Sequence, residues 1–263
     1  MLQRRSMLQS LAIQFRSIHA LMVRDVMMRY GREHLGFVWV VLEPMLLTAG
    51  VLIIWSLIRP SHEHGIRLIG LVITGYMPLT LWRHQTNAAL LLFRRSTAML
   101  YHRQLTLLDI FLSRMILEFA GTTAALLFVY FVLVSSGLLE PVQDISLAVA
   151  GWLMMGWLAF GVAALTVVLT ELYEVAERFV QPFQYLQLPI SGTFFLIDWL
   201  PYDAQQLIWY NPTVHTYEMF RGGFFGPSIV THYSVPYVAT WAFVLSSIGL
   251  WVIGNMRSRI RIV

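Results

Sequence analysis

Residues 32–44 read REHLGFVWVVLEP and mark the point at which a polar N-terminal segment becomes apolar. Apolar residues then predominate as far as Ile58, and about 20 such residues suffice to cross ~30 Å of hydrocarbon. Proline is tolerated in the first turns of a membrane helix, whereas a carboxylate facing lipid costs about 3 kcal/mol. We therefore expect Glu43, next to Pro44, to face protein or water near the membrane surface. Arg32 is a candidate partner for it; the alternative is a carboxylate that reaches the lipid headgroups.

The composition predicts an all-α polytopic membrane protein. Hydrophobic residues make up 57% of the 263 residues and charged residues 12%, whereas soluble domains average about 45–50% and about 25%. We expect one transmembrane domain, residues 37–263, after a cytoplasmic segment, residues 1–36. Six runs are long enough to span the bilayer: 37–58, 66–93, 105–134, 145–170, 179–197 and 235–254.

The arginines predict the orientation of these spans. All 18 basic residues are arginine, and an N-terminus inside the cell assigns 14 of them to internal segments and three to external ones. Positive residues collect on the cytoplasmic side of membrane proteins, so both termini are expected there. The three external arginines, Arg59, Arg67 and Arg221, are predicted to form an electropositive patch that attracts an acidic polymer.

The first 36 residues predict a helix that lies in the cytoplasmic membrane interface. Apolar residues recur every three or four positions from Leu8 to Val26, and polar residues fill the other face. The alternative is an ordinary helix packed on another subunit. A secretory signal is not expected, because no continuous apolar region follows Arg4 and Arg5.

The sequence lacks the motifs of common enzymes. Without lysine it contains no phosphate-binding loop of the ATPase type, so ATP-driven work would need ATP and Mg²⁺ on a separate subunit. It also has no cysteine, no His-Glu-x-x-His pattern and no Gly-x-Ser-x-Gly elbow. His62 and His64 are interpreted as solvated loop residues, since no other metal ligands lie nearby in sequence. We therefore predict no catalytic residue, no metal site and no cofactor on this chain.

Polar residues interrupt two of the predicted spans. The second carries five consecutive polar residues at 83–87, which must face a partner helix or water. They would line a channel, form an internal hydrogen-bonded cluster, or follow a span that already ends near Trp82. In the third span Arg114 and Glu118 are four residues apart and predict an ion pair along one helix, with a proton relay as the alternative.

The stretch MRYGREHLGFVWVVLEPML resembles the first-span signature of ABC-2 type exporter permeases, the membrane subunits that export capsular polysaccharide, O-antigen or teichoic acid. The Glu43–Pro44 form looks most like the capsular polysaccharide branch. Residues 211–226, NPTVHTYEMFRGGFFG, resemble the segment before the family's last span. The layout of six spans is similar over nearly the whole chain. The matching first-span residues are Arg29, Tyr30, Leu35, Gly36, Phe37, Trp39 and Pro44.

The resemblance implies a transport permease, not an enzyme, in the bacterial inner membrane. Its implied partners are a second copy of itself, two copies of a separate ABC ATPase, and a periplasmic adaptor that leads to an outer-membrane exporter. The implied cargo is a lipid-linked, acidic capsular polysaccharide, and nucleic acid is not an expected partner. The family layout also implies a re-entrant or external helix, near residues 212–221, before the last span.

Roles can be assigned to several groups of residues. By their own chemistry, Arg32, Glu43 and Pro44 would form a gate or joint at the first span, and the resemblance implies the roles that follow. The substrate channel would be lined by Arg83, His84, Gln85, Asn87, Trp39, Tyr210 and Tyr217. The surface that couples to the ATPase would contain Arg95, Met99, Leu100, Tyr101 and Arg103, with Glu174 from the second cytoplasmic loop.

Each assignment has a competing interpretation. Anionic lipid headgroups suit the basic coupling loop, and Trp and Tyr belong at every membrane interface. The acidic residues Glu171, Glu174 and Glu177 would meet a basic patch on the ATPase or form a solvated face. For the whole chain, the alternatives are an ABC-2 exporter of another cargo, such as O-antigen, teichoic acid or a small molecule, and an integral membrane enzyme acting on lipid-linked sugars. The enzyme would use Asp198, Asp203 and His215.

Overall fold

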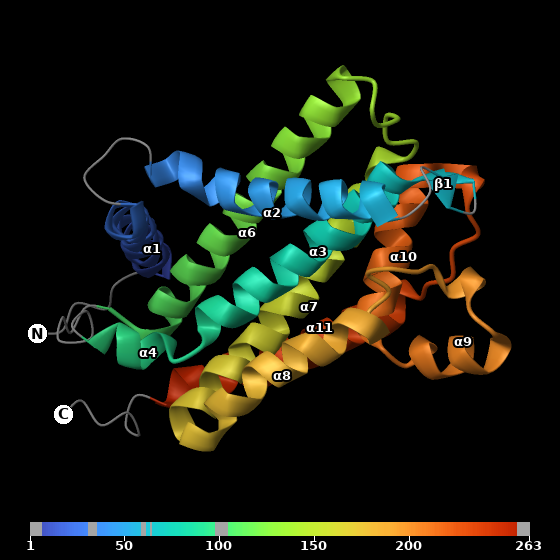
Figure 1. Cartoon of the computed structure of the whole chain (residues 1–263). Helices are drawn as coiled ribbons and strands as arrows, with labels where there is room; N and C mark the ends of the chain where they lie inside the picture. The colour runs from blue at the N-terminus through green and yellow to red at the C-terminus, as the bar shows by residue number, and fades with distance from the viewer. Residues whose placement is uncertain (1–6, 31–35, 59–61, 64, 98–104, 257–263) are drawn as a thin grey trace, which may run out of the picture.

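The computed structural model describes residues 7–30, 36–58, 62–63, 65–97 and 105–256 (Figure 1). Helices dominate this part of the chain, and one short β-hairpin pairs His62 with Arg67 and Glu63 with Ile66. In chain order the elements are α1 (Met7–Tyr30), α2 (Gly36–Ile58), β1 (His62–Glu63), β2 (Ile66–Arg67), α3 (Leu68–Ala89), α4 (Leu92–Arg95), α6 (Leu107–Ser135), α7 (Ile145–Leu172), α8 (Glu174–Ile190), η1 (Ile197–Trp199), α9 (Tyr202–Trp209), α10 (Pro212–Phe225), η2 (Gly226–Ser228) and α11 (Val235–Asn255).

Three of the described helices, α6, α7 and α11, are long and apolar enough to cross a membrane. With 29 and 28 residues, α6 and α7 are about 42–44 Å long at 1.5 Å per residue, which leaves room for tilt. The other three predicted spans also fall on helices: α2, α3 and α8. The 17 residues of α8 reach only about 26 Å. The chain is therefore a helical membrane protein, and the count of six spans stays a prediction.

The long helices begin at side chains that satisfy their first backbone N–H groups. At α6 the Asp109 N–H donates to Thr106 Oγ1 at 3.1 Å and the Thr106 N–H donates to Asp109 Oδ2 at 3.0 Å, a reciprocal capping box. At α7 the Leu147 N–H donates to Asp144 Oδ1 at 3.0 Å. The hydrogen bonds from the Ser146 hydroxyl and the Leu147 N–H hold the pKa of the Asp144 carboxyl below its usual value. Polar residues at these points therefore fix where the two helices start.

The helix α7 is central, because its most extensive contacts are with α11, α10 and α3. Its crossing with α10 is close enough to need glycine on both helices. A Cβ atom added to Gly151 would lie 2.5 Å from the backbone nitrogen of Phe220, and one added to Gly223 would lie 2.2 Å from the backbone nitrogen of Ala148. Gly151 of α7 and Gly223 of α10 therefore serve packing within one chain.

The elements divide between two ends of the bundle (Figure 1). At one end lie α1, α4, the turn from α7 to α8, and the last residues of α11. At the other end lie the β-hairpin, α9 and α10. The arginine count assigns the first group to the cytoplasm and the second to the outside, so the arrangement agrees with that division while the orientation itself stays a prediction.

The helix α1 lies across the direction of α2 and packs against α6 (Figure 1). Leu21 is buried in the apolar cluster at this end, and the Asp25 carboxylate lies 3.6 Å from Arg114 of α6. Phe15, on the predicted apolar face, is 73% exposed. The helix thus anchors to its own chain through one face and leaves the apolar residue Phe15 free, as an interfacial helix would.

Three predicted segments have different boundaries in the structure, and one is the predicted span 179–197, because α8 begins at Glu174 and ends at Ile190. The second predicted span, 66–93, breaks after Ala89, because Leu91 has a left-handed φ of 50° before α4 begins. The predicted external helix near residues 212–221 is α10, and its residues 213–224 are buried within the bundle. The helix is therefore packed inside the bundle, and its depth relative to the membrane stays a prediction.

The crossing of α7 and α10 predicts the effect of a single methyl group. Gly151→Ala should lower the free energy of unfolding by about 1–3 kcal/mol, because the backbone of α10 has to move away. Gly50→Ala in α2 is the matched control, since no atom lies within 4 Å of the added methyl. Thermal denaturation in detergent measures both variants, and equal midpoints for the two would contradict the close crossing.

Candidate functional site

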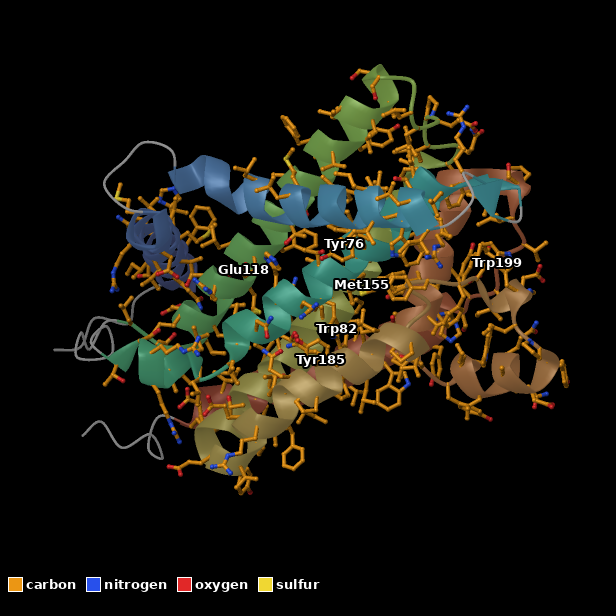
Figure 2. All side chains as sticks on the ribbon, viewed as in Figure 1. Tyr76, Trp82, Glu118, Met155, Tyr185 and Trp199 are labelled. Atoms are coloured by element: carbon orange, nitrogen blue, oxygen red, sulfur yellow. The ribbon has the colours of Figure 1, made fainter. Side chains whose placement is uncertain are left out.

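The polar segment of α3 lies between α6 and α8. On the α8 side, the Arg83 guanidinium stands 5.6 Å from the centre of the Tyr185 ring (Figure 2). There too, Asn87 Oδ1 accepts from Gln184 Nε2 at 2.9 Å and from Gln181 Nε2 at 3.2 Å. The polar residues therefore connect α3 to α8, and the helix continues past Trp82 instead of ending there.

Three polar atoms in and beside this segment have no hydrogen-bond partner among the described residues. They are Trp82 Nε1, Gln85 Oε1 and Gln184 Oε1, all within side chains that are at most 4% exposed. Buried polar groups are normally paired with protein or water, so this cluster has hydrogen-bonding capacity that water or a polar ligand would fill. The assignment of Arg83, His84, Gln85 and Asn87 to a substrate channel stays a prediction.

A charged cluster joins α1, α3 and α6 on the other side of the segment. Arg114 Nε lies 3.3 Å from Glu118 Oε1, which confirms the ion pair predicted along α6. The other carboxylate oxygen of Glu118 lies 3.5 Å from His84 Nδ1, and Asp25 approaches Arg114 from α1. Glu118 is 5% exposed (Figure 2). The cluster therefore ties α1 to the polar segment of α3.

An apolar groove of about 570 Å³ lies beside the polar segment. Its walls come from α7, α8 and α11, with Leu158, Phe183 and Trp241 among the lining residues, and Trp82 of α3 lies at its edge. The aromatic and aliphatic lining suits hydrocarbon, whereas the adjacent segment of α3 suits polar groups.

Most predicted residues of the gate and of the coupling loop fall outside the described part of the chain. Arg32, Arg59 and residues 98–104, which include Met99, Leu100, Tyr101 and Arg103, are not described. Trp39, Glu43 and Pro44 belong to α2, which runs through Pro44, but their side chains are outside the description. Arg95 at the end of α4 and Glu174 at the start of α8 are both exposed at the end of the bundle that carries α1.

The end of the bundle that carries α9 is organised by Arg221 of α10, whose side chain is fully buried. Its Nη1 donates to the carbonyl oxygens of Gly192, at 2.6 Å, and Phe195. Its Nη2 donates to the Thr193 carbonyl at 2.7 Å, and its Nε donates to Thr74 Oγ1 at 3.3 Å. The guanidinium thereby holds the turn that follows α8 against α3.

Two further side chains of α10 hold neighbouring loops. Glu218 accepts the Ile197 N–H and the His232 N–H, both at 3.0 Å. The Ser234 N–H donates to His215 Nδ1 at 3.1 Å, so His215 Nε2 carries the proton and donates to the Trp209 carbonyl at 2.9 Å. Burial lowers the pKa of His215, which favours this neutral form. Sequence reasoning missed Glu218, although a Glu and an Arg three residues apart in an apolar segment signal a buried pair.

Two assigned residues need correction. Arg221 is buried and its donors are engaged by protein, so it does not belong to an external electropositive patch. Tyr217 is 1% exposed and hydrogen-bonded to Thr193, so it does not line an open channel in this chain. Charge counting and aromatic content predict on which side of the membrane a residue lies, but they do not predict whether its side chain is buried.

Two other residues with assigned roles have exposed side chains. Arg67 is exposed and lies 3.7 Å from Glu140, and Tyr210 is 74% exposed.

Known proteins resemble this chain over nearly its whole length, although no protein-family model matches it. It is 34% identical to the "Capsule polysaccharide export inner-membrane protein BexB" of Haemophilus influenzae over 94% of this chain and 93% of that protein. Identity is also 34% to the "Capsule polysaccharide export inner-membrane protein CtrC" of Neisseria meningitidis, over 97% and 96%. The chain is 22% identical to the "Polysialic acid transport protein KpsM" of Escherichia coli, over 89% of this chain and 91% of that protein.

The helical fold and its buried polar contacts define an integral membrane protein with at least three apolar helices of spanning length. The chain belongs to the family of capsule polysaccharide export inner-membrane proteins, and it is itself an inner-membrane protein. The resemblance drawn from the first span and from residues 211–226 is thereby confirmed at the level of the family.

The buried Arg221 predicts a large loss of stability on substitution. Arg221→Met keeps much of the side-chain volume but removes the donors to three carbonyl groups, so the free energy of unfolding should fall by about 3–5 kcal/mol. Arg67→Met, at an exposed position, should change it by less than about 1 kcal/mol. Thermal denaturation in detergent compares the two, and a parent-like midpoint for Arg221→Met would contradict the role assigned to this guanidinium.

Proposed function

We propose that this chain is the transmembrane subunit of an exporter that moves a capsular polysaccharide from the cytoplasm across the inner membrane. The observation that carries the proposal is its identity of 33–34% to capsule polysaccharide export proteins over 94–97% of its length. Because this sequence identity extends over the whole transmembrane region and not over one motif, it supports the same transport function for this chain.

ATP hydrolysis on a separate subunit drives the export in this proposal. The absence of lysine supports it, because a phosphate-binding loop cannot be built in this sequence. The subunit acts as a homodimer with two ATPase copies, and residues 98–104 together with exposed Arg95 and Glu174 form the surface that contacts the ATPase. In support, Arg95 and Glu174 lie at one end of the bundle, next to the turn from α7 to α8 (Figure 1).

The cargo is proposed to be lipid-linked and acidic. The apolar groove between α7, α8 and α11 suits the hydrocarbon of a lipid anchor, and the polar segment of α3 beside it suits the sugar portion. An acidic polymer is supported by the external arginines Arg59 and Arg67 alone, now that Arg221 is excluded from that surface. A periplasmic adaptor would receive the polymer at the end of the molecule that carries α9.

The membrane-enzyme alternative is weakened by the contacts of its candidate residues. His215 is buried with both ring nitrogens engaged by backbone groups, so neither is free to accept a substrate proton. Asp198 lies 3.7 Å from His232. An exporter of another cargo differs from the proposal only in the polymer or molecule that is carried.

Co-purification tests the transport mechanism. The tagged chain, extracted from its native membrane in mild detergent, should retain an ABC-class ATPase. Leu100→Ala combined with Tyr101→Ala should weaken that contact by about 30-fold or more, because aromatic anchors contribute at least about 2 kcal/mol to interfaces. Tyr202→Ala is the control, since this exposed tyrosine lies on α9 at the other end. Purification of the parent chain without any ATPase would refute the ATP-driven mechanism.

A further inference from the structure

The chain between α3 and α4 is sharply bent at a strained position. Leu91 adopts a φ of 50° and a ψ of 34°, the left-handed region that branched side chains rarely occupy. The helix α4 that follows has only four residues, and such a short helix is not stable by itself. Contacts from elsewhere in the chain must therefore hold this bend and the direction of α4.

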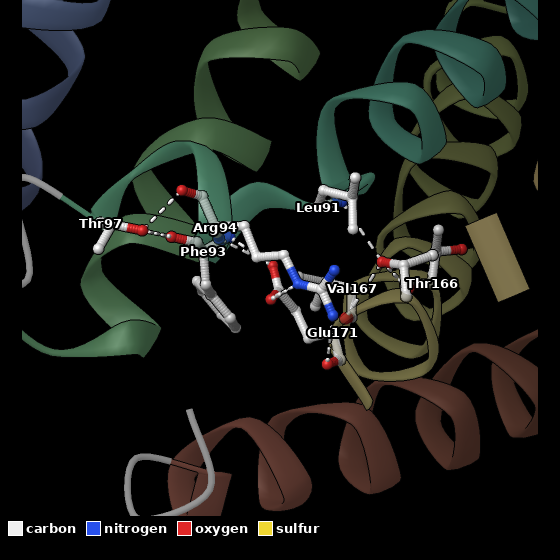
Figure 3. Close-up of polar contacts among 8 residues, drawn as sticks. Leu91, Phe93, Arg94, Thr97, Thr166, Val167 and Glu171 are labelled. Atoms are coloured by element: carbon white, nitrogen blue, oxygen red, sulfur yellow. Dashed lines mark hydrogen bonds and ion pairs between the residues drawn. The ribbon is translucent and has the colours of Figure 1, made fainter. Parts of the chain in front are cut away.

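The last residues of α7 supply those contacts (Figure 3). The Thr170 hydroxyl oxygen accepts the Leu91 N–H at 3.3 Å. One carboxylate oxygen of Glu171 accepts the N–H groups of Phe93 and Arg94, at 2.8 and 3.1 Å. The other carboxylate oxygen lies 3.5 Å from Arg94 Nε, and Arg94 Nη2 donates to the Glu171 carbonyl at 3.4 Å. The N–H groups in the first turn of α4 have no partner within that helix. They are satisfied by Glu171, which lies 78 residues after Phe93 and 77 after Arg94.

We call the contacts of Thr170 and Glu171 with residues 91–94 the α4–α7 joint. The burial of Glu171 fixes the orientation of α4 in this joint. Its side chain is 2% exposed, whereas that of Arg94 is 45% exposed. A buried carboxylate requires hydrogen-bond donors in fixed positions, so α4 cannot turn away without leaving the charge unpaired. Glu174 and Glu177, the other members of the acidic series, are exposed. The series is therefore not one solvated face, because its first member is an internal anchor.

The joint connects two segments that precede cytoplasmic loops. The helix α4 leads directly into residues 98–104, and Glu171 lies one residue before α7 ends at Leu172, where the chain turns into α8. We propose that Thr170 and Glu171 are positioning residues that make α4 and the end of α7 move as one body. The value of this joint for export rests on the proposed function: a push on residues 98–104 by an ATPase would then reach α7 directly.

A distance measurement tests the joint without any ATPase. The chain has no cysteine, so Leu169→Cys on α7 and Arg95→Cys on α4, both exposed, accept spin labels at two defined positions. The labelled chain in lipid nanodiscs should give one narrow distance distribution. Adding Glu171→Ala should broaden it, whereas Glu171→Gln should keep it narrow, because an amide oxygen still accepts the two N–H groups. An unchanged distribution in Glu171→Ala, or a broad one in the parent, would overturn the proposal.

An export assay tests the consequence. Glu171→Ala should reduce surface polysaccharide by about tenfold or more, the factor that matches the loss of one hydrogen bond to a charged group. Protein level and ATPase co-purification should stay as in the parent, and Tyr202→Ala, at an exposed position of α9, should export normally. Normal export by Glu171→Ala would overturn the coupling role. A parent chain that binds no ATPase would instead refute the proposed function, and the distance measurement would still decide on the joint.

Discussion

The backbones of α7 and α10 meet at a crossing that only glycine permits, and the end of the molecule that carries α9 and α10 depends on that contact. Gly151 and Gly223 let α10 lie deep in the bundle, where its residues 213–224 are buried. From that position Arg221 reaches the turn after α8, and Glu218 reaches the loops before η1 and α11. Each of these groups is expensive to bury alone, so the crossing and the hydrogen bonds support one another.

The same helix α7 runs from this crossing to the opposite end of the bundle, where Glu171 lies about 30 Å beyond Gly151 along the helix. There Thr170 and Glu171 hold α4, while α11 packs along α7 over much of its length. One long helix is therefore fixed at both ends by polar contacts and along its middle by apolar ones. In an exporter such a helix would transmit movement of the cytoplasmic loops to the outer loops, because a packed helix shifts as a rigid rod.

Much of the fold was predictable from the sequence, because long apolar runs and their caps are local signals. All six predicted runs overlap helices, although 66–93 and 179–197 extend past the ends of α3 and α8, and the family follows from residues near Pro44 and from 211–226. The site was less predictable, because burial is a tertiary property. Arg221 was predicted to lie on an exposed surface, but its side chain is buried. The joint at Glu171 was missed, since nothing near Leu91 in sequence signals a left-handed bend or a partner so far along the chain.

The central claim is that this chain moves a finished polysaccharide and takes no part in making it. The most direct test removes the chain from its native cell and measures the polymer inside the cell and at the surface separately. The account predicts that total polymer stays near normal, that the polymer collects inside, and that re-expression of the chain returns it to the surface. Polymer that still reaches the surface without the chain, or a cell that makes no polymer at all, would contradict it.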